Sequence, residues 1–297
     1  MNYLKWWLIM HLKGAEKFLE KLPGYAGSRI FLLPILGLLS FLIGILFMLF
    51  LDIASRLFPN SYFLFLIDPI LPLIGTATCG IIGFVLVSQV WHKKDKLLKK
   101  YNELAYQKAF KFAILAIPQI LAIICHAYLP IGLLSSKSPV SETTIVLSSS
   151  LLSFLLGMSY FGLIVRIIGS VALFMLGLLI IFRALFTFGI DYMGLVYLYY
   201  PEESEVQDHE IYSVLRHPAY AGVLLISAGA IFARLSLYSL IFFAIILLGF
   251  LCHIRLVEEK ELVVRFGASF LEYRRRVPAL IVKPRMLGAF FRFLIGH

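Results

Sequence analysis

Charged residues are scarce in this 297-residue chain, at 15% of the sequence, whereas hydrophobic residues reach 61%. Soluble proteins contain roughly 45–50% apolar residues. The shortage of charge therefore excludes a soluble globular protein, a disordered chain and a collagen-like protein. We predict an all-α fold, a polytopic integral membrane bundle of helices whose main partner is the bilayer.

Cysteine is also rare. Cys79, Cys125 and Cys252 all lie inside apolar runs, and none belongs to a CxxC motif. His126 and His253 directly follow two of them, which is not the spacing of metal ligands. We predict three buried small hydrophobic cysteines, a core histidine at His126, no disulfide framework and no metal site.

Several motifs of common enzymes are missing as well. The chain contains no GxGxxG after a strand, no GxxxxGK[ST], no HExxH and no GxSxG. It also offers no alternation of strands and helices that could house a dinucleotide. A Rossmann-type nucleotide site is therefore not expected. The basic segments favour a solvated loop or anionic lipid over nucleic acid as a partner.

Long apolar runs are what the sequence has in abundance. A membrane-spanning helix needs about 20 apolar residues. Candidates lie at 30–51, 69–90, 111–134, 144–165 and 167–189, with shorter runs at 219–233 and 236–254. The last two predict a C-terminal two-helix hairpin. Residues 1–17 mix lysine with tryptophan and predict an interfacial amphipathic helix rather than a signal peptide.

The basic segments indicate the orientation. The loop 91–111 carries seven lysines, the tail from Arg255 onward is also basic, and the net charge is +10. The positive-inside rule places both segments in the cytoplasm. Three candidate spans and the hairpin separate them, however, and an odd number of crossings cannot begin and end on one side. Either one candidate does not cross, the serine-rich run 144–165 being the weakest, or the loop is an exception.

Polar residues gather at the two ends of the predicted hairpin. Arg216 and His217 precede it, and Glu258 and Glu259 follow it. Two helices of about 17 residues, each rising about 1.5 Å per residue, return the acidic pair to the level of the basic pair. An interfacial ion pair would explain this spacing, and so would a zwitterionic ligand. In the second case the Arg216 guanidinium would bind a carboxylate of the ligand, and Glu258 would bind its ammonium group or ribose hydroxyls.

The joint pattern resembles the membrane methyltransferase family that includes isoprenylcysteine carboxyl methyltransferase and the small phospholipid methyltransferases. The family pattern is Arg-His-Pro-x-Tyr-x-Gly, a hairpin of about forty residues, then Glu-Glu-x-x-Leu-x-x-x-Phe-Gly, a tyrosine and Val-Pro. This chain matches it with 216–222, 258–262, 266–267, Tyr273 and 277–278. The segment before the hairpin is also similar to the family, through 166–169, Gly177, Arg183 and 188–189. The resemblance therefore covers roughly residues 160–284.

The resemblance implies S-adenosylmethionine as the cofactor and methyl transfer to a lipophilic acceptor, an isoprenoid carboxylate or another lipid-like molecule, at the cytoplasmic membrane surface. The residues it implies for cofactor binding are His209, Tyr212, Arg216, His217, Pro218, Tyr220, Gly222, Glu258 and Glu259. Arg255 lies near the position of a catalytic, substrate-orienting arginine. Arg183 either contacts the acceptor or extends toward the membrane surface.

Two regions are expected on this basis. Residues 1–150 form an N-terminal transmembrane region of unknown role with the loop 91–111, and residues 151–297 form a methyltransferase-like membrane core with a basic amphipathic tail. The oligomeric state stays open.

The chain departs from the family pattern in two places. Only His209-Glu210-Ile211 remains of the usual loop before Tyr212, and Phe270 replaces a tyrosine. Two alternatives stay open. NADPH-dependent membrane sterol or enone reductases share part of the tail pattern, although the carboxylate pair would repel the extra phosphate of NADPH. A non-catalytic membrane protein could also retain the motif for packing.

Overall fold

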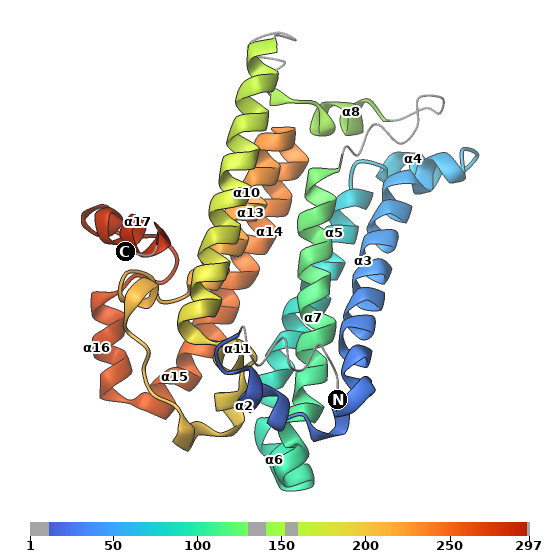
Figure 1. Ribbon diagram of the computed structural model, residues 1–297. Coiled ribbons are helices and arrows are strands. Elements are labelled where there is room, and N and C mark those ends of the chain that lie inside the picture. The colour runs from blue at the N-terminus through green and yellow to red at the C-terminus, as the bar shows by residue number, and fades with distance from the viewer. Residues whose placement is uncertain (1–11, 130–140, 152–159, 296–297) are drawn as a thin grey trace.

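A computed structural model describes residues 12–129, 141–151 and 160–295, and every regular element among them is helical (Figure 1). The predicted all-α membrane bundle is therefore confirmed. Most of the predicted N-terminal amphipathic helix lies outside the described residues, which begin shortly before α2 (Ala15–Glu20).

Within the described residues, five helices are long and apolar enough to cross a membrane. They include α3 (Leu32–Leu57), α5 (Leu71–His92), α7 (Ala105–Tyr128), α10 (Tyr160–Phe188) and α14 (Leu237–His253). The shorter apolar helix α13 (Pro218–Arg234) pairs with α14 as the predicted hairpin. The remaining α-helices are α4 (Tyr62–Ile67), α6 (Lys94–Tyr101), α8 (Glu142–Ser148), α11 (Ile190–Met193), α12 (Val196–Tyr199), α15 (Glu259–Phe266), α16 (Ala268–Arg276) and α17 (Leu287–Ile295).

The candidate span 144–165 is wrong as one continuous helix, because α8 ends at Ser148 and Ser149 has an extended backbone. Residues 152–159 of this candidate lie outside the described residues, and α10 is described from Tyr160. An apolar run shows that residues prefer lipid, but it does not show where the helical backbone stops. With this span removed, α7 and α10 make one excursion and α13 and α14 make another. The basic helix α6 and the tail helices α15 and α16 then lie at the same end of the bundle, which resolves the conflict (Figure 1).

Glycines bring α10 and α13 into direct backbone contact. A Cβ atom at Gly177 would lie 2.5 Å from the carbonyl oxygen of Gly222, and one at Gly222 would lie 2.6 Å from the carbonyl oxygen of Gly177. In a membrane, where lipid is as apolar as the side chains, such small residues let helices associate by close packing. This contact fixes the start of the hairpin against the preceding span.

Buried polar groups pair at the opposite end of the bundle. The His126 Nε2 atom lies 2.7 Å from Asp52 Oδ2, which confirms His126 as a core histidine. Cys79 is buried as predicted, but Cys125 and Cys252 are exposed, so the prediction of three buried cysteines is wrong for these two. The reason is that a spanning helix can direct apolar residues toward lipid as well as toward protein.

We expect Gly177→Ala to destabilise the chain because the added methyl group would lie 2.5 Å from the carbonyl oxygen of Gly222 and 2.7 Å from Ile226 Cγ1. Overpacking of this kind costs about 1–3 kcal/mol. Thermal unfolding in detergent should therefore show a lower midpoint for Gly177→Ala than for Gly288→Ala, the matched control, whose added Cβ meets nothing within 4 Å. Equal midpoints for the two variants would contradict the packing role assigned to Gly177.

Candidate active site

The predicted hairpin is set up by residues at its entry and at its tip. Pro218 opens α13 at a position where its missing N–H group is not needed. At the tip, Leu235 adopts a left-handed conformation, and Ser236 and Ser239 form a reciprocal capping box that starts α14. The chain therefore turns back sharply, and the two ends of the hairpin meet.

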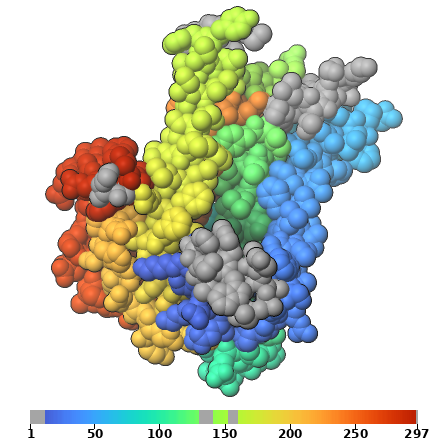
Figure 2. Space-filling view, viewed as in Figure 1, coloured from blue at the N-terminus to red at the C-terminus, as the bar shows by residue number. Residues whose placement is uncertain are grey.

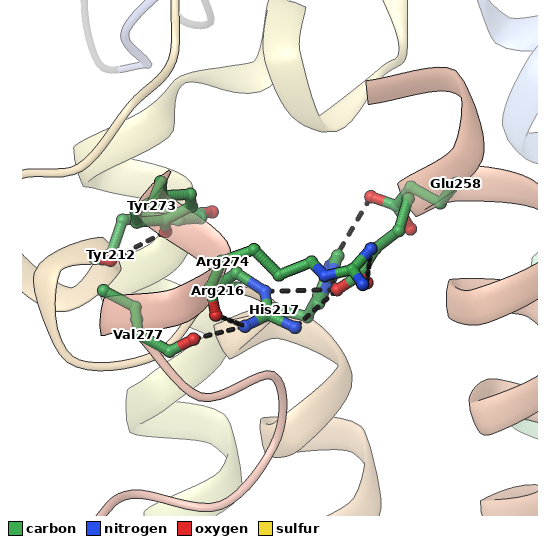
Figure 3. Close-up of polar contacts among 8 residues, drawn as sticks. Tyr212, Arg216, His217, Glu258, Tyr273, Arg274 and Val277 are labelled. Atoms are coloured by element: carbon green, nitrogen blue, oxygen red, sulfur yellow. Dashed lines mark hydrogen bonds and ion pairs between the residues drawn. The ribbon is translucent and has the colours of Figure 1, made fainter. Parts of the chain in front are cut away.

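The meeting point is an ion pair between Arg216 and Glu259. The Arg216 Nη2 and Nε atoms lie 2.6 Å and 3.1 Å from Glu259 Oε1, and both side chains are about nine-tenths buried. Arg216 Nη1 donates to the main-chain carbonyl oxygens of Arg274, at 2.9 Å, and Val277 (Figure 3). The guanidinium that was expected to meet a ligand carboxylate is therefore engaged by the protein itself.

The tail completes this closure through its backbone. The amides of Arg216 and His217 donate to the carbonyl oxygens of Pro278 and Ala279 at 2.9 Å and 3.0 Å. The Tyr273 hydroxyl donates to the carbonyl oxygen of Tyr212 at 2.7 Å. The tyrosine and Val-Pro parts of the motif thus hold the tail across the entry of the hairpin.

His217 lies between the two glutamates. Its Nδ1 atom is 3.6 Å from Glu258 Oε1, and its Nε2 atom is 3.3 Å from Glu259 Oε1. Burial lowers the pKa of His217, but the two carboxylates outweigh this effect and raise the pKa to about 9. The imidazole is therefore protonated at neutral pH and offsets part of the negative charge of the glutamate pair.

A cavity opens beside this cluster. Among the predicted cofactor residues, Tyr212, Arg216, His217, Pro218, Tyr220 and Glu258 line it. Its aromatic faces are ordered by stacking. Phe188 lies 4.4 Å from Tyr212, and Tyr220 lies 5.7 Å from His217, measured between ring centroids. The cavity therefore combines aromatic faces with one acidic and two basic groups from the motif.

Glu258 is the exceptional group in this cavity. It ends a π-helical turn, Ile254–Glu258, that interrupts the regular helix between α14 and α15. Such turns often redirect a side chain at a functional site. Within the described part of the chain, the Glu258 Oε2 atom is buried and has no hydrogen-bond partner. The Tyr220 hydroxyl and His217 both interact with this carboxylate by charge and by side-chain hydrogen bonding, but among the described residues the Oε2 atom itself has no donor. A buried carboxylate oxygen without a donor is costly, and a ligand that brings an N–H or O–H group would satisfy it.

The structure places the other predicted residues outside the cavity lining. Gly222 contacts the backbone of α10, and Glu259 holds Arg216. His209 and Arg255 are exposed. Arg183 donates through Nε to the carbonyl oxygen of Leu294 at 2.9 Å and so connects α10 to α17. The expected set thus divides into residues that face the cavity and residues that surround or support it.

Sequence reasoning missed much of the cavity wall. The additional lining residues include Trp91 from α5, Tyr192 and Met193 from α11, and Tyr197 from α12. A tryptophan at the end of a span is ordinary for a membrane interface, so Trp91 carried no separate signal. Among the described residues, no three His, Cys, Asp or Glu side chains gather as metal ligands would.

Comparison with known proteins supports the resemblance seen in the motifs. Residues 165–269 match the phospholipid methyltransferase family. Protein-S-isoprenylcysteine O-methyltransferase A of Arabidopsis thaliana is 31% identical over 119 residues, which are 40% of this chain and 56% of that protein. Its B counterpart from the same plant is 30% identical over 96 residues, 32% of this chain and 49% of that protein.

A probable protein-S-isoprenylcysteine O-methyltransferase of Oryza sativa subsp. indica is 29% identical over 119 residues, 40% of this chain and 58% of that protein. The chain thus spans about half the length of the curated relatives it matches. No solved structure matches it. The segment that holds the hairpin, with Arg216, His217, Glu258 and Glu259, is thus similar to this family.

The raised pKa of His217 predicts a pH dependence of stability. A histidine pKa above its unfolded value near 6.5 makes the pairing fully stabilising below about pH 6.5, and this stabilisation is lost as the pH rises through about 9. Between pH 6.5 and 9, the unfolding midpoint in detergent should fall more for the parent than for His217→Gln. The fall in midpoint of the parent should exceed that of His217→Gln by at least about 3 °C, since 1 kcal/mol corresponds to roughly 2–4 °C in a large domain. Parallel curves for the two proteins would contradict the pairing.

Proposed function

We propose that the chain is an S-adenosylmethionine-dependent methyltransferase that acts on a lipophilic acceptor at the cytoplasmic surface of a membrane. The observation that carries this proposal is the convergence of Tyr212, His217, Tyr220 and Glu258 on one cavity at the end of a membrane bundle. The named relatives are methyltransferases, and the matched segment contains all four residues.

The cavity suits a cationic donor. The Glu258 carboxylate can accept from the ammonium group or the ribose hydroxyls of the cofactor through its unpartnered oxygen. The aromatic faces of Phe188, Tyr212 and Tyr220 favour a positive charge placed over them. The Glu258 carboxylate would repel a phosphate group of NADPH placed beside it, which supports the methyltransferase over the reductase.

The chemistry asks the protein mainly for alignment and exclusion of water. S-adenosylmethionine supplies, when bound, a methyl group that its positively charged sulfur already activates. The closed Arg216–Glu259 pair and the tail across the hairpin hold the cavity residues in fixed positions. A carboxylate acceptor needs no general base, only a cation that orients it. We assign that orienting role to Arg255, which is exposed on the π-helical turn three residues before Glu258.

The acceptor to test first is a prenylated cysteine with a free carboxylate, because the relatives are named for methylation of isoprenylcysteine. The placement of the cavity supports a membrane-bound acceptor. The lining helices α11 and α15 lie at the end of the bundle that carries α6 (Figure 1), where a water-soluble cofactor and a lipid-anchored acceptor can both arrive. The lysines of the 91–111 loop predict that this end faces the cytoplasm.

We expect Glu258→Gln to weaken binding of S-adenosylhomocysteine by about 10- to 100-fold, because a hydrogen bond to a charged group contributes about 1.5–3 kcal/mol. Isothermal titration calorimetry in detergent measures the change. Glu272→Gln is the matched control, since Glu272 is exposed on α16 and does not line the cavity. Equal affinities for the two variants would remove Glu258 from the proposed cofactor site.

The same titration with NADPH, together with transfer of radiolabelled methyl groups from the cofactor to an N-acetylated S-farnesylcysteine, tests the reaction class. Binding of S-adenosylhomocysteine and labelling of the acceptor are the expected results. Binding of NADPH alone would favour the reductase. Absence of binding by both cofactors would favour a protein that retains the motif for packing.

A further inference from the structure

One wall of the cavity depends on helices that lie outside the matched segment. We call residues 189–200, which contain α11 and α12, the wall segment. Within it, Tyr192, Met193, Leu195, Tyr197 and Leu198 line the cavity. α11 and α12 contain only four residues each, which is too short for a helix to be stable alone. The wall segment therefore needs external contacts to keep its shape.

Tyr106 supplies the most central of these contacts. It is 1% exposed on α7, and its hydroxyl donates to the carbonyl oxygen of Gly194 at 2.7 Å. Gly194 lies between two lining residues, and the next residue, Leu195, has a positive φ of 63°, which is strained for a leucine. The Tyr106 hydrogen bond thus fixes the wall segment beside its least favourable backbone conformation.

Two further attachments hold the ends of the wall segment. Near its start, the amide of Ile190 donates to the carbonyl oxygen of Lys13 at 2.9 Å, and Lys13 Nζ donates to the carbonyl oxygen of Thr187 at 2.6 Å. Near its end, the Tyr199 hydroxyl donates to the carbonyl oxygen of Val90 at 2.8 Å. The space-filling view shows blue N-terminal atoms against the yellow part of the chain at this end of the molecule (Figure 2).

Trp91 lines the cavity directly from the last turn of α5. Its ring meets the ring of His253 edge to face, with centroids 5.0 Å apart. His253 ends α14, immediately before the π-helical turn that carries Glu258. Trp91 therefore forms a part of the cavity wall near Glu258, the carboxylate that we propose binds the cofactor, and it belongs to the N-terminal half of the chain.

We propose that the chain at Lys13, together with α5 and α7, completes the active-site cavity, with Trp91 as a wall residue that contacts the bound ligand and Tyr106 as a positioning residue that acts through the wall segment. The choice of S-adenosylhomocysteine as the ligand probe rests on the proposed function. The positioning of the wall by Tyr106 does not.

The first test compares two tyrosines that make the same kind of bond. Tyr106→Phe removes the hydroxyl bonded to Gly194, and Tyr128→Phe removes a hydroxyl that donates at 2.7 Å to the carbonyl oxygen of Ile226, away from the cavity lining. Hydrogen–deuterium exchange of residues 190–200 should become at least about fivefold faster in Tyr106→Phe and stay unchanged in Tyr128→Phe. Unchanged exchange in Tyr106→Phe would overturn the positioning role, whether or not any cofactor binds.

The same pair separates positioning from general stability. Tyr106→Phe should weaken S-adenosylhomocysteine binding about three- to tenfold, as expected for one hydrogen bond that holds the wall. Tyr128→Phe should bind S-adenosylhomocysteine with an affinity within twofold of the parent, even if its unfolding midpoint falls by as much as that of Tyr106→Phe. Equal losses of affinity in the two variants would show a merely structural effect and overturn the proposal.

The second test uses fluorescence. Trp6, Trp7 and Trp91 are the three tryptophans of the chain, so Trp6→Phe/Trp7→Phe leaves Trp91 as the sole tryptophan reporter. S-adenosylhomocysteine should shift or quench the Trp91 emission with the same dissociation constant that calorimetry gives. Binding by calorimetry without any change in emission would overturn ligand contact by Trp91 and leave the proposed function intact. Absence of calorimetric binding would refute the proposed function, and the exchange comparison would still decide the role of Tyr106.

Discussion

The buried ion pair between Arg216 and Glu259 is the constraint on which the site depends. It joins Arg216, which lies before the hairpin, to Glu259, which lies after it. The Nη1 atom of Arg216 also donates to the carbonyl oxygens of Arg274 and Val277 and so fixes the tail. Breaking such a pair by removing one partner leaves an uncompensated buried charge, which costs about 3–5 kcal/mol. The cavity therefore exists only while α13, α14 and the tail are held together at this point.

This constraint gives two adjacent glutamates different roles. Glu259 faces Arg216 and is fully engaged, whereas Glu258 keeps a buried carboxylate oxygen without a partner in the described part of the chain. The two side chains differ in direction because consecutive residues of a helix do not share a face, and Glu258 ends the π-helical turn whereas Glu259 begins α15. Protonated His217 lies between them and lowers the cost of keeping two carboxylates so close.

The sequence predicted the parts of the molecule that follow from chain geometry. The rise of a helix determines where an out-and-back hairpin returns, so the meeting of Arg216 with the glutamate pair was predictable. The failed span 144–165 shows that an apolar run does not reveal where a helix ends. The exposed Cys125 and Cys252 show that apolar character does not distinguish lipid from protein as a neighbour. Trp91 could not be predicted as a cavity residue, because its position depends on the tertiary packing of α5 against α14.

The contrast between the two sides of the cavity explains why the N-terminal helices matter to its shape. On the hairpin side, motif residues are fixed by a buried ion pair and by close backbone contact between α10 and α13. On the other side, α11 and α12 are single turns joined at a strained leucine, and such a segment cannot hold one conformation by itself. A cavity of this kind therefore requires some external support for its second wall. In this chain Lys13, α5 and α7 provide it through hydrogen bonds that are each accepted by a main-chain carbonyl oxygen.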